Sequence, residues 1–167
     1  MIRKAIVEDS SRMAEIHVFG WRSAYNKFIS LDKLFGHFSV KNRTENFKEY
    51  LTDDKFKDGN FVFEEENIIK AILTIGNCRD KDKNEKTYEL MGIYVDPIFQ
   101  RQKIGSKLVD YCIKEAIKNN KEEISLWVFE KNIETIKFYE KMGFKKEGKK
   151  EFYEYYNENA IRMNMKL

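Results

Sequence analysis

The sequence has few of the residues on which metal sites and disulfide frameworks depend, with two cysteines and two histidines among 167 residues. Cys78 and Cys112 are far apart and belong to no Cys-x-x-Cys or Cys/His spacing, which argues against a zinc site and a disulfide framework. Cys112 falls on an apolar helical stripe and is expected to be a small core residue. With His17 and His37 as the only histidines, neither a His-based triad nor a cysteine nucleophile is favoured.

Long apolar runs and an excess of one charge are also missing. No run approaches the length of a membrane span, and the N-terminus carries Arg3, Glu8 and Asp9 where a signal peptide would be apolar. We therefore expect a cytoplasmic protein without a membrane partner. The 31 Lys and Arg residues nearly balance the 28 Asp and Glu residues, and both signs are interspersed. Because nucleic-acid binding needs clustered basic charge, no nucleic-acid partner is expected.

The hydrophobic residues that are present, 42% of the chain, suffice for one domain over residues 1–167. Periodicity and cap residues indicate the order of elements. Helices are expected from Asp9 or Ser10 to Ala24, near 31–35, from a Ser39 cap to Leu51, from Ile104 to Ala116, and from an Asn132 cap to Gly143. Strands are expected at 2–7, 61–63, 68–75, 87–95, 123–129, 149–156 and 160–167. On the first helix, His17 is expected to be a packed, hydrogen-bonded histidine.

The connections between strands predict the sheet. Short polar links favour antiparallel hairpins in the first half and at the end of the chain, and residues 78–86 form a charged surface loop. The strand at 123–129 follows a helical crossover, so it should run parallel to the strand at 87–95. The fold class is therefore α/β (α+β), with a mixed, mostly antiparallel sheet flanked by helices.

The segment Tyr94 to Ala116 reads as strand, loop and amphipathic helix. A helix start offers free backbone N–H groups and the positive end of the macrodipole, so a loop leading directly into it can hold a phosphate. Alternatively, this is an ordinary strand, loop and helix in which Gly105 only eases a tight turn.

Two segments carry a family resemblance. Glu89 to Pro97 followed by Gln100 to Ser106 resembles the central motif of the GNAT superfamily of N-acetyltransferases, Gln/Arg-x-x-Gly-x-Gly/Ala. Lys103 departs from this motif, because a glycine usually stands there. Asn132 to Phe144 is similar to the family's second motif, in which Asn opens a short helix that contains Phe-Tyr and closes with Gly-Phe. The resemblance extends in order over essentially the whole chain.

The resemblance implies an acetyl-CoA-dependent N-acetyltransferase of the GNAT-like fold that works by direct attack of a primary amine. In this family the two parallel strands splay apart and admit the pantetheine arm of the cofactor. The implied cofactor contacts are the backbone of Ile93, Tyr94 and Val95, the loop residues Gln100, Arg101, Gln102, Lys103, Ile104, Gly105 and Ser106, and Asn132. The N–H group of Ile93 would also stabilise the oxyanion.

Two residues match catalytic positions of the family. Glu89 matches the general base, directly or through water, and alternation along the strand predicts that it shares a face with Ile93 and Val95. The alternative is a glutamate at a solvated strand end. Tyr139 matches the tyrosine that protonates the coenzyme A thiolate, and its alternative is a plain core residue.

The amine acceptor is the least specified part. Trp21, Tyr25 and Phe28 are candidates for an aromatic wall, and Glu64–Glu66 or Phe152–Tyr156 could attract a cation, although each is more often ordinary core or surface. A polyamine or a peptide N-terminus is expected, and a homodimer only by analogy. Rival functions are a catalytically silent acyl-CoA sensor on the same fold and a nucleotide-binding module. The missing Gly-Lys-Ser/Thr ending argues against the second rival.

Overall fold

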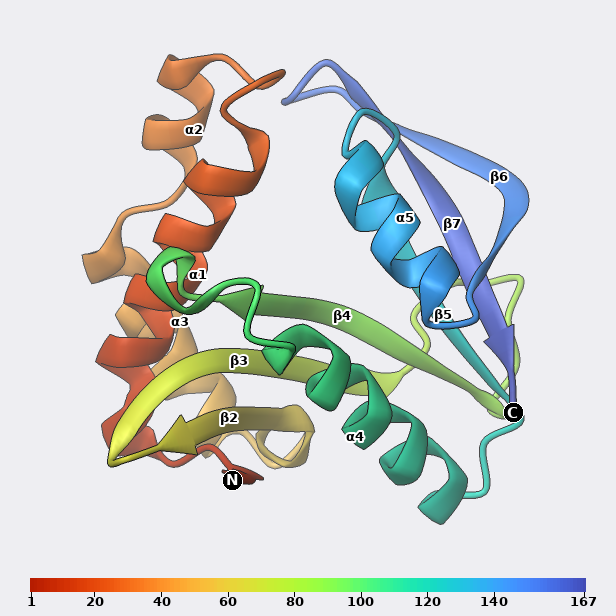
Figure 1. Ribbon diagram of the computed structural model, residues 1–167, viewed down its shortest axis with the longest axis horizontal. Coiled ribbons are helices and arrows are strands. Elements are labelled where there is room, and N and C mark those ends of the chain that lie inside the picture. Colours follow the sequence, from red (N-terminus) through yellow and green to blue (C-terminus); the bar gives the residue numbers. More distant parts are fainter.

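A computed structural model describes all 167 residues as one α/β fold (Figure 1). The helices are α1 (Ser10–Tyr25), α2 (Leu31–His37), α3 (Val40–Thr52), α4 (Ile104–Lys118) and α5 (Ile133–Lys141), with short 3-10 turns at Val7–Asp9, Lys57–Gly59 and Pro97–Phe99. The strands are β1 (Ile2–Lys4), β2 (Asn60–Glu65), β3 (Ile68–Asn77), β4 (Thr87–Val95), β5 (Glu123–Phe129), β6 (Lys145–Tyr153) and β7 (Glu158–Lys166).

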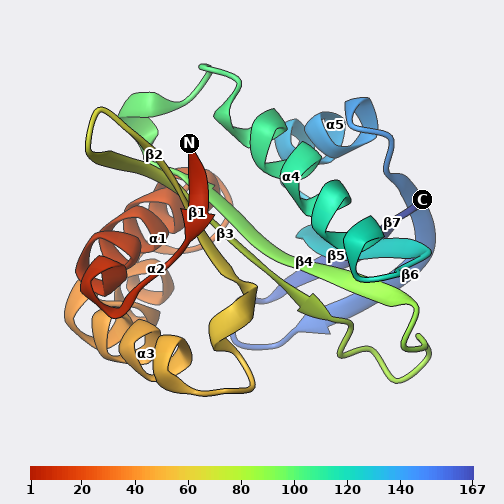
Figure 2. The ribbon, with the colours of Figure 1, turned by 90° about the horizontal axis from the view of Figure 1, so that it is seen from below.

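All seven strands form one sheet in the order β1-β2-β3-β4-β5-β7-β6. Every neighbouring pair is antiparallel except β4 and β5, which are parallel because α4 crosses between them. Figure 2 shows α1, α2 and α3 on one face of the sheet, and α4 and α5 on the other. The predicted mixed, mostly antiparallel sheet flanked by helices is confirmed.

The core lies on both faces of the sheet because adjacent residues of a strand point to opposite sides. Phe61 and Leu73 face α4, where Leu108 and Cys112 are fully buried. Their strand neighbours Val62 and Ile72, together with Met13 and Phe47, belong to the cluster beneath α1 and α3. Cys112 is therefore the small core residue that its position on the apolar stripe predicts.

Helix ends follow the predicted cap residues. The Ser39 hydroxyl accepts a hydrogen bond from the backbone N–H of Asn42 at 3.1 Å, and Gly143 takes the left-handed conformation after α5 with a φ of +99°. Asp9 stands at the N-cap position of α1, as predicted, but makes no side-chain capping bond, because its carboxylate accepts from the backbone N–H of Ile6 and binds Arg3.

The last hairpin differs from prediction in its bounds. The strand expected at 149–156 occupies Lys145–Tyr153, so the turn falls at 154–157, before the expected position. Asn157 takes a φ of +54°, which asparagine tolerates better than most residues. A register shift around Gly148 lets the strand begin earlier than the periodicity indicates.

His17 is packed as expected, but it is not hydrogen-bonded at Nδ1. Its ring lies 4.6 Å from that of Tyr94 and 6.2 Å from that of Trp21, and the residue is 4% exposed. Burial lowers the pKa of His17, so a neutral imidazole occupies this site.

The β3–β4 loop, residues 78–86, is more than a solvated surface loop. Arg162 of β7 donates to Asp80 at 3.0 Å and to Asp82 at 2.8 Å, while Lys83 binds Glu123 of β5. These contacts tie the loop to the face of β5 and β7 opposite α4 and α5. The loop consequently holds Arg79 beside β4.

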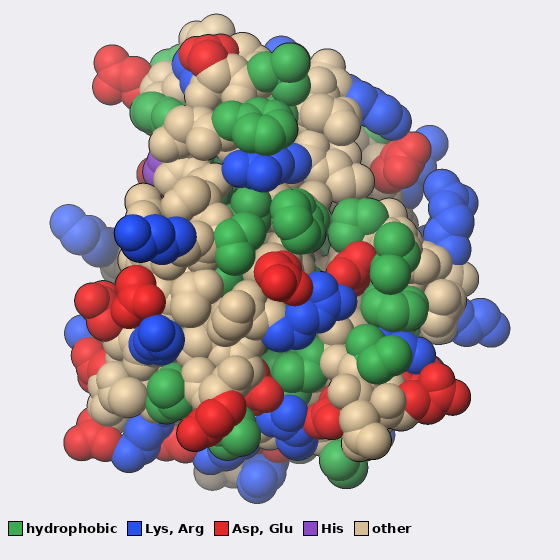
Figure 3. All heavy atoms as spheres, turned by 90° about the vertical axis from the view of Figure 1, so that its left-hand side faces the viewer, with side chains coloured by type: hydrophobic (Ala, Val, Ile, Leu, Met, Phe, Trp, Pro, Cys, Tyr) green, Lys and Arg blue, Asp and Glu red, His purple; other side chains and the backbone are tan.

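The outer surface mixes both signs of charge. Figure 3 looks onto the side of α1, α2 and α3, where basic and acidic side chains are interspersed and hydrophobic side chains gather in small groups. None of the helices combines the length and the apolar character that crossing a bilayer requires.

Candidate active site

Strands β4 and β5 are joined only at their beginnings. Thr87–Glu89 pairs with Glu123–Ser125, and no pair follows, although both strands continue. A cleft of about 1620 Å³ opens between them and extends between α1 and α5. In Figure 1 the half with β4 and α1 diverges from the half with β5, β7 and α5. The expected splay of the two parallel strands is therefore present.

A β-bulge in β4 lies at the start of this splay. Thr74 of β3 is opposite Gly92 while the next residue, Ile75, is opposite Leu90, so Met91 is an extra residue. A bulge bends its strand and disturbs the alternation of side chains. The bend accompanies the separation of β4 from β5.

The bulge also corrects one prediction about Glu89. Leu90 packs in the core on the α4 side, as Ile93 and Val95 do, although regular alternation would separate Leu90 from them. Glu89, the neighbour of Leu90, therefore points to the opposite face, the side of Tyr94 and α1. The expected shared face with Ile93 and Val95 was wrong because one inserted residue reverses the alternation.

The loop before α4 presents a row of free donors. The backbone N–H groups of residues 101–106 donate to no acceptor of the protein. Arg101 and Lys103 have φ angles of +62° and +60°, and left-handed residues in such positions turn successive N–H groups toward one concavity. Together with the N-terminus of α4, this arrangement suits a phosphate group.

The left-handed φ of Lys103 explains why a glycine is usual there in the motif. A non-glycine residue in this conformation costs about 1 kcal/mol, which a stable fold tolerates. Gly105, in contrast, has no conformational need of glycine. A Cβ at this position would meet the Phe138 ring at 3.4 Å, an ordinary contact, so the fold itself leaves room for a side chain.

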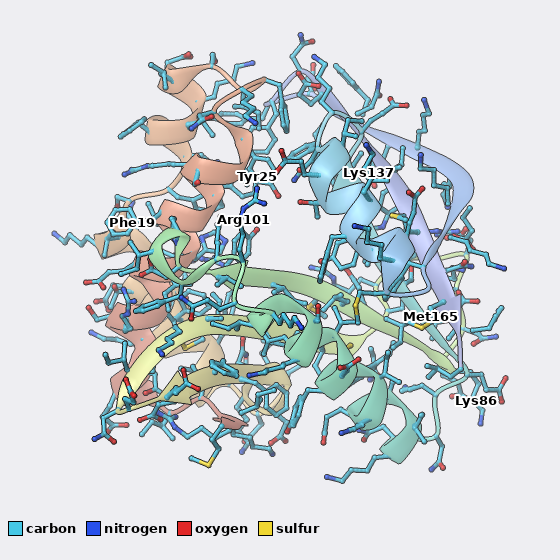
Figure 4. The ribbon with its side chains drawn as sticks, in the orientation of Figure 1. Phe19, Tyr25, Lys86, Arg101, Lys137 and Met165 are labelled. Carbon is cyan, nitrogen blue, oxygen red and sulfur yellow. The ribbon has the colours of Figure 1, made fainter.

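Helix α5 forms the opposite wall. Asn132 caps it, accepting from the N–H of Thr135 at 3.4 Å, and Tyr139 faces the cleft with 7% exposure. The Tyr139 hydroxyl makes no hydrogen bond to the protein, and burial raises the pKa of Tyr139 well above its ordinary value. Figure 4 shows Lys137 of α5 across the space from Tyr25 and Arg101.

Glu89 is bound by Arg79 of the β3–β4 loop. Arg79 Nε donates to Glu89 Oε2 at 3.0 Å, Nη2 donates to Oε1 at 2.5 Å, and the backbone N–H donates to Oε2 at 3.1 Å. Glu89 is only 5% exposed, so the alternative of a solvated strand end is wrong. Three of roughly four acceptor directions of the carboxylate are used, which leaves one on Oε1.

The expected aromatic wall closes the end of the cleft near α1. Trp21 and Tyr25 lie 4.5 Å apart between ring centroids, and Tyr25 lies 5.6 Å from Phe28. Residues that sequence analysis had not assigned to this wall complete it. Phe129 at the end of β5 lies 5.1 Å from Tyr25, and Tyr156 from the β6–β7 turn lies 5.4 Å from Trp21.

Nearly all predicted site residues line the one cleft. These are Trp21, Tyr25, Phe28, Glu89, Ile93, Tyr94, Val95, Gln100, Arg101, Lys103, Ile104, Gly105, Ser106, Asn132 and Tyr139. Gln102 does not line it, and Glu64–Glu66 lie elsewhere, where Glu64 binds Arg3. Arg79 and Trp127 line it without having been predicted, because their places depend on a loop and a splay that carry no local sequence signal.

Comparisons with known proteins agree with this geometry. The model of the acetyltransferase (GNAT) family matches residues 17–144. An uncharacterized N-acetyltransferase of Bacillus subtilis, YuaI, is 28% identical over 144 residues, which cover 83% of this chain and 76% of that protein. The PaiA N-acetyltransferase of Thermoplasma acidophilum, solved in complex with coenzyme A, has a TM-score of 0.79 at 19% identity and covers 100% of this chain and 98% of its own. YncA of Salmonella typhimurium, solved with acetyl-CoA, has a TM-score of 0.72 at 22% identity, with 100% and 93% covered.

Proposed function

The chain belongs to the acetyltransferase (GNAT) family, and from this premise we propose that it transfers the acetyl group of acetyl-CoA to a primary amine by direct attack in a ternary complex. The observation that carries the proposal is the cleft between β4 and β5, which joins the loop of residues 101–106, the proposed phosphate-binding loop, to Glu89 and Tyr139. Neither cysteine lines this cleft, so an acyl-cysteine intermediate is not part of the proposal.

The cleft wall offers groups that fit acetyl-CoA. The free N–H groups of residues 101–106 would hold the pyrophosphate, while Gln100 and Asn132 border the same space. Side chains of Lys103, Lys137 and Lys141 add positive charge along it. Beyond Glu89, β4 has no partner on its β5 side, so backbone groups of Ile93–Val95 are available to a pantetheine amide. PaiA and YncA, which share the fold, were solved with coenzyme A and acetyl-CoA.

The reaction forms a C–N bond and breaks the C–S bond of the thioester. Tyr139 would give its phenolic proton to the departing thiolate, and its raised pKa keeps that proton in place at neutral pH. The N–H group of Ile93 is the proposed oxyanion donor. Glu89 would take the amine proton, directly or through water, at the acceptor direction that Arg79 leaves open on Oε1.

Because Glu89 lies on the α1 face of the sheet, the amine and acetyl-CoA would bind on different sides of the cleft. The phosphate-binding loop belongs to the α4 side, whereas Glu89 and the aromatic wall of Trp21, Tyr25 and Phe28 lie toward α1. An amine held by this wall would reach the thioester from the side opposite the cofactor arm. The acceptor would be a small molecule or a peptide N-terminus, and a homodimer remains part of the proposal.

The test is release of free thiol from acetyl-CoA across a panel of polyamines, amino acids and peptides, with Tyr139→Phe as control. We expect turnover with one amine class and a loss of roughly 100-fold or more in the control, the usual effect of removing a positioned acid. Tight acetyl-CoA binding without turnover on any amine would support the rival acyl-CoA sensor. Absence of acetyl-CoA binding would refute the proposal.

A further inference from the structure

The acceptor end of the cleft has no free carboxylate for a polycation. Glu89 is bound by Arg79, and Asp80, which does not line the cleft, accepts from the Trp127 indole N–H at 3.1 Å and from Arg162 at 3.0 Å. The other acidic residue of the lining, Glu134, is a solvated residue of the rim, 4.0 Å from Lys27. A polyamine would therefore meet no unpaired buried negative charge.

The lining of the cleft as a whole is basic. Seven Lys and Arg side chains contribute to it against two Glu side chains: Lys27, Arg79, Arg101, Lys103, Lys131, Lys137 and Lys141 against Glu89 and Glu134. The phosphates of acetyl-CoA would account for the cations near α4 and α5, while Lys131 is paired with Glu158 at 2.7 Å. Arg79 is not among these, because it projects from the β3–β4 loop and lies against Glu89.

The guanidinium of Arg79 binds Glu89 through one edge and leaves its other edge free. Its Nε and Nη2 atoms donate to Glu89, whereas Nη1 has no acceptor in the protein. The side chain is 67% exposed and lines the cleft, while its inner edge is fixed by a buried carboxylate. A guanidinium that is held on one edge and open on the other suits a second carboxylate, which it can bind through two parallel N–H groups.

We propose that the acceptor is an α-amino acid with an apolar or aromatic side chain, and that Arg79 binds its carboxylate; this inference rests on the proposed acetyltransferase function. The amine and carboxylate of an α-amino acid are attached to one carbon. Anchoring the carboxylate at the open edge of Arg79 therefore brings the amine beside Glu89, which adjoins the inner edge.

The aromatic wall supplies the place for the acceptor's side chain. Trp21, Tyr25, Phe28, Phe129 and Tyr156 enclose the end of the cleft with ring centroids 4.5 to 6.1 Å apart in their contacting pairs. The ring surfaces that line the cleft can bind an apolar side chain through burial and ring contacts. Figure 4 shows Tyr25 across the cleft from Lys137 of α5, and all five rings line the same cleft as Arg79.

The experiment compares acceptors that differ only in the carboxylate. Thiol release from acetyl-CoA is measured with phenylalanine, phenylalaninamide and phenethylamine, and separately with ornithine and putrescine. The amide imitates a peptide N-terminus. Its amine is less basic than that of phenylalanine, so without recognition of the carboxylate the amide should react faster. We expect a kcat/KM at least about tenfold higher for phenylalanine than for the other two aromatic amines, the effect of one charge-assisted interaction.

Arg79→Gln identifies the residue responsible. It should lower kcat/KM for phenylalanine, mostly through KM, at least about tenfold more than kcat/KM for phenethylamine, and any loss that the two acceptors share reports on Glu89. Arg79→Lys should recover only part of the loss, since an ammonium cannot bind bidentately. Lys86→Gln is the matched control: it removes one positive charge from the same loop, and Figure 4 shows Lys86 far from the cleft.

Two outcomes would overturn the inference without touching the proposed function. One is preferred turnover of putrescine, phenethylamine or phenylalaninamide. The other is an equal loss on all acceptors in Arg79→Gln, which would mean that Arg79 acts only through Glu89. Calorimetric titration with acetyl-CoA distinguishes failure of this inference from failure of the proposed function. Absence of cofactor binding would refute the acetyltransferase proposal itself.

Discussion

Glu89 of β4 and Ser125 of β5 are the last residues that pair the two parallel strands. Both are buried polar residues on the face opposite α4 and α5, yet their hydrogen bonding differs. Glu89 accepts three hydrogen bonds from Arg79, whereas the Ser125 hydroxyl has no partner. This pair permits a comparison between a residue with a proposed chemical role and a neighbour without one.

Glu89→Gln should lower kcat by about 100-fold, because an amide cannot take the amine proton. It should also destabilise the fold by about 1–3 kcal/mol, since the amide nitrogen places a donor against the Arg79 guanidinium. Steady-state kinetics and urea unfolding measure the two effects.

Ser125→Ala is the matched control across the pair. Removing a buried hydroxyl that has no partner should leave kcat within about twofold and raise stability by up to about 1 kcal/mol. If Glu89→Gln lost stability but kept its kcat, the carboxylate would serve only to position Arg79.

The elements of this fold could be predicted from sequence because their signals are local. Apolar spacing in α4, the Ser39 cap and Gly143 after α5 each depend on residues a few positions apart. The face of Glu89 could not be predicted, because a single inserted residue at Met91 reverses the alternation and leaves no pattern of its own. The role of Arg79 was hidden for another reason: Arg162, 83 positions away, anchors its loop.

Lys103→Gly tests the departure from the family motif. Glycine relieves the left-handed φ of +60° but adds freedom to the unfolded chain, so the free energy of unfolding should stay unchanged or rise by up to about 1 kcal/mol. Acetyl-CoA affinity should fall by less than about tenfold, because the proposed direct contact is the backbone N–H and the ammonium adds only screened charge. Urea unfolding and calorimetric titration measure both.

The neighbouring residue provides the control for this backbone argument. Gln102 has no positive φ, so Gln102→Gly should lower stability by about 0.5–1 kcal/mol. An equal loss in both variants would mean that the left-handed conformation of Lys103 carries no strain.

Gly105→Ala should separate folding from cofactor binding. The added Cβ meets Phe138 at an ordinary 3.4 Å and helix α4 gains a better helix former, so stability should hold or rise by up to about 1 kcal/mol. If a pyrophosphate approaches the backbone of residues 101–106, the same Cβ should weaken acetyl-CoA binding about tenfold or more. Unchanged affinity would show that the phosphate binds elsewhere, and Ser106→Ala, which keeps the backbone free, should bind acetyl-CoA within about threefold of wild type.

Alkaline pH should destabilise the protein through buried groups that hold their protons. Burial raises the pKa of Cys112 to about 12 and that of Tyr94 to about 12, from ordinary values of 9.0 and 10.0. Above pH 9 the unfolded chain therefore loses protons that the native state keeps. Since the native state then binds more protons, the free energy of unfolding must fall as pH rises, from about pH 9 for Cys112 and about pH 10 for Tyr94.

Cys112→Ala isolates the contribution of Cys112 ionisation from that of Tyr94. The small cavity that the substitution leaves lowers stability equally at every pH, so only the loss of the thiol changes the slope of the curve. Between pH 9 and 10 the Cys112 thiol should contribute a fall of about 1 kcal/mol, which the variant should lack. Tyr94→Phe should instead flatten the curve only above pH 10. Urea unfolding at half-unit pH steps gives these slopes. Curves that stayed parallel for wild type and Cys112→Ala would mean that Cys112 ionises as readily in the native core as in the unfolded chain.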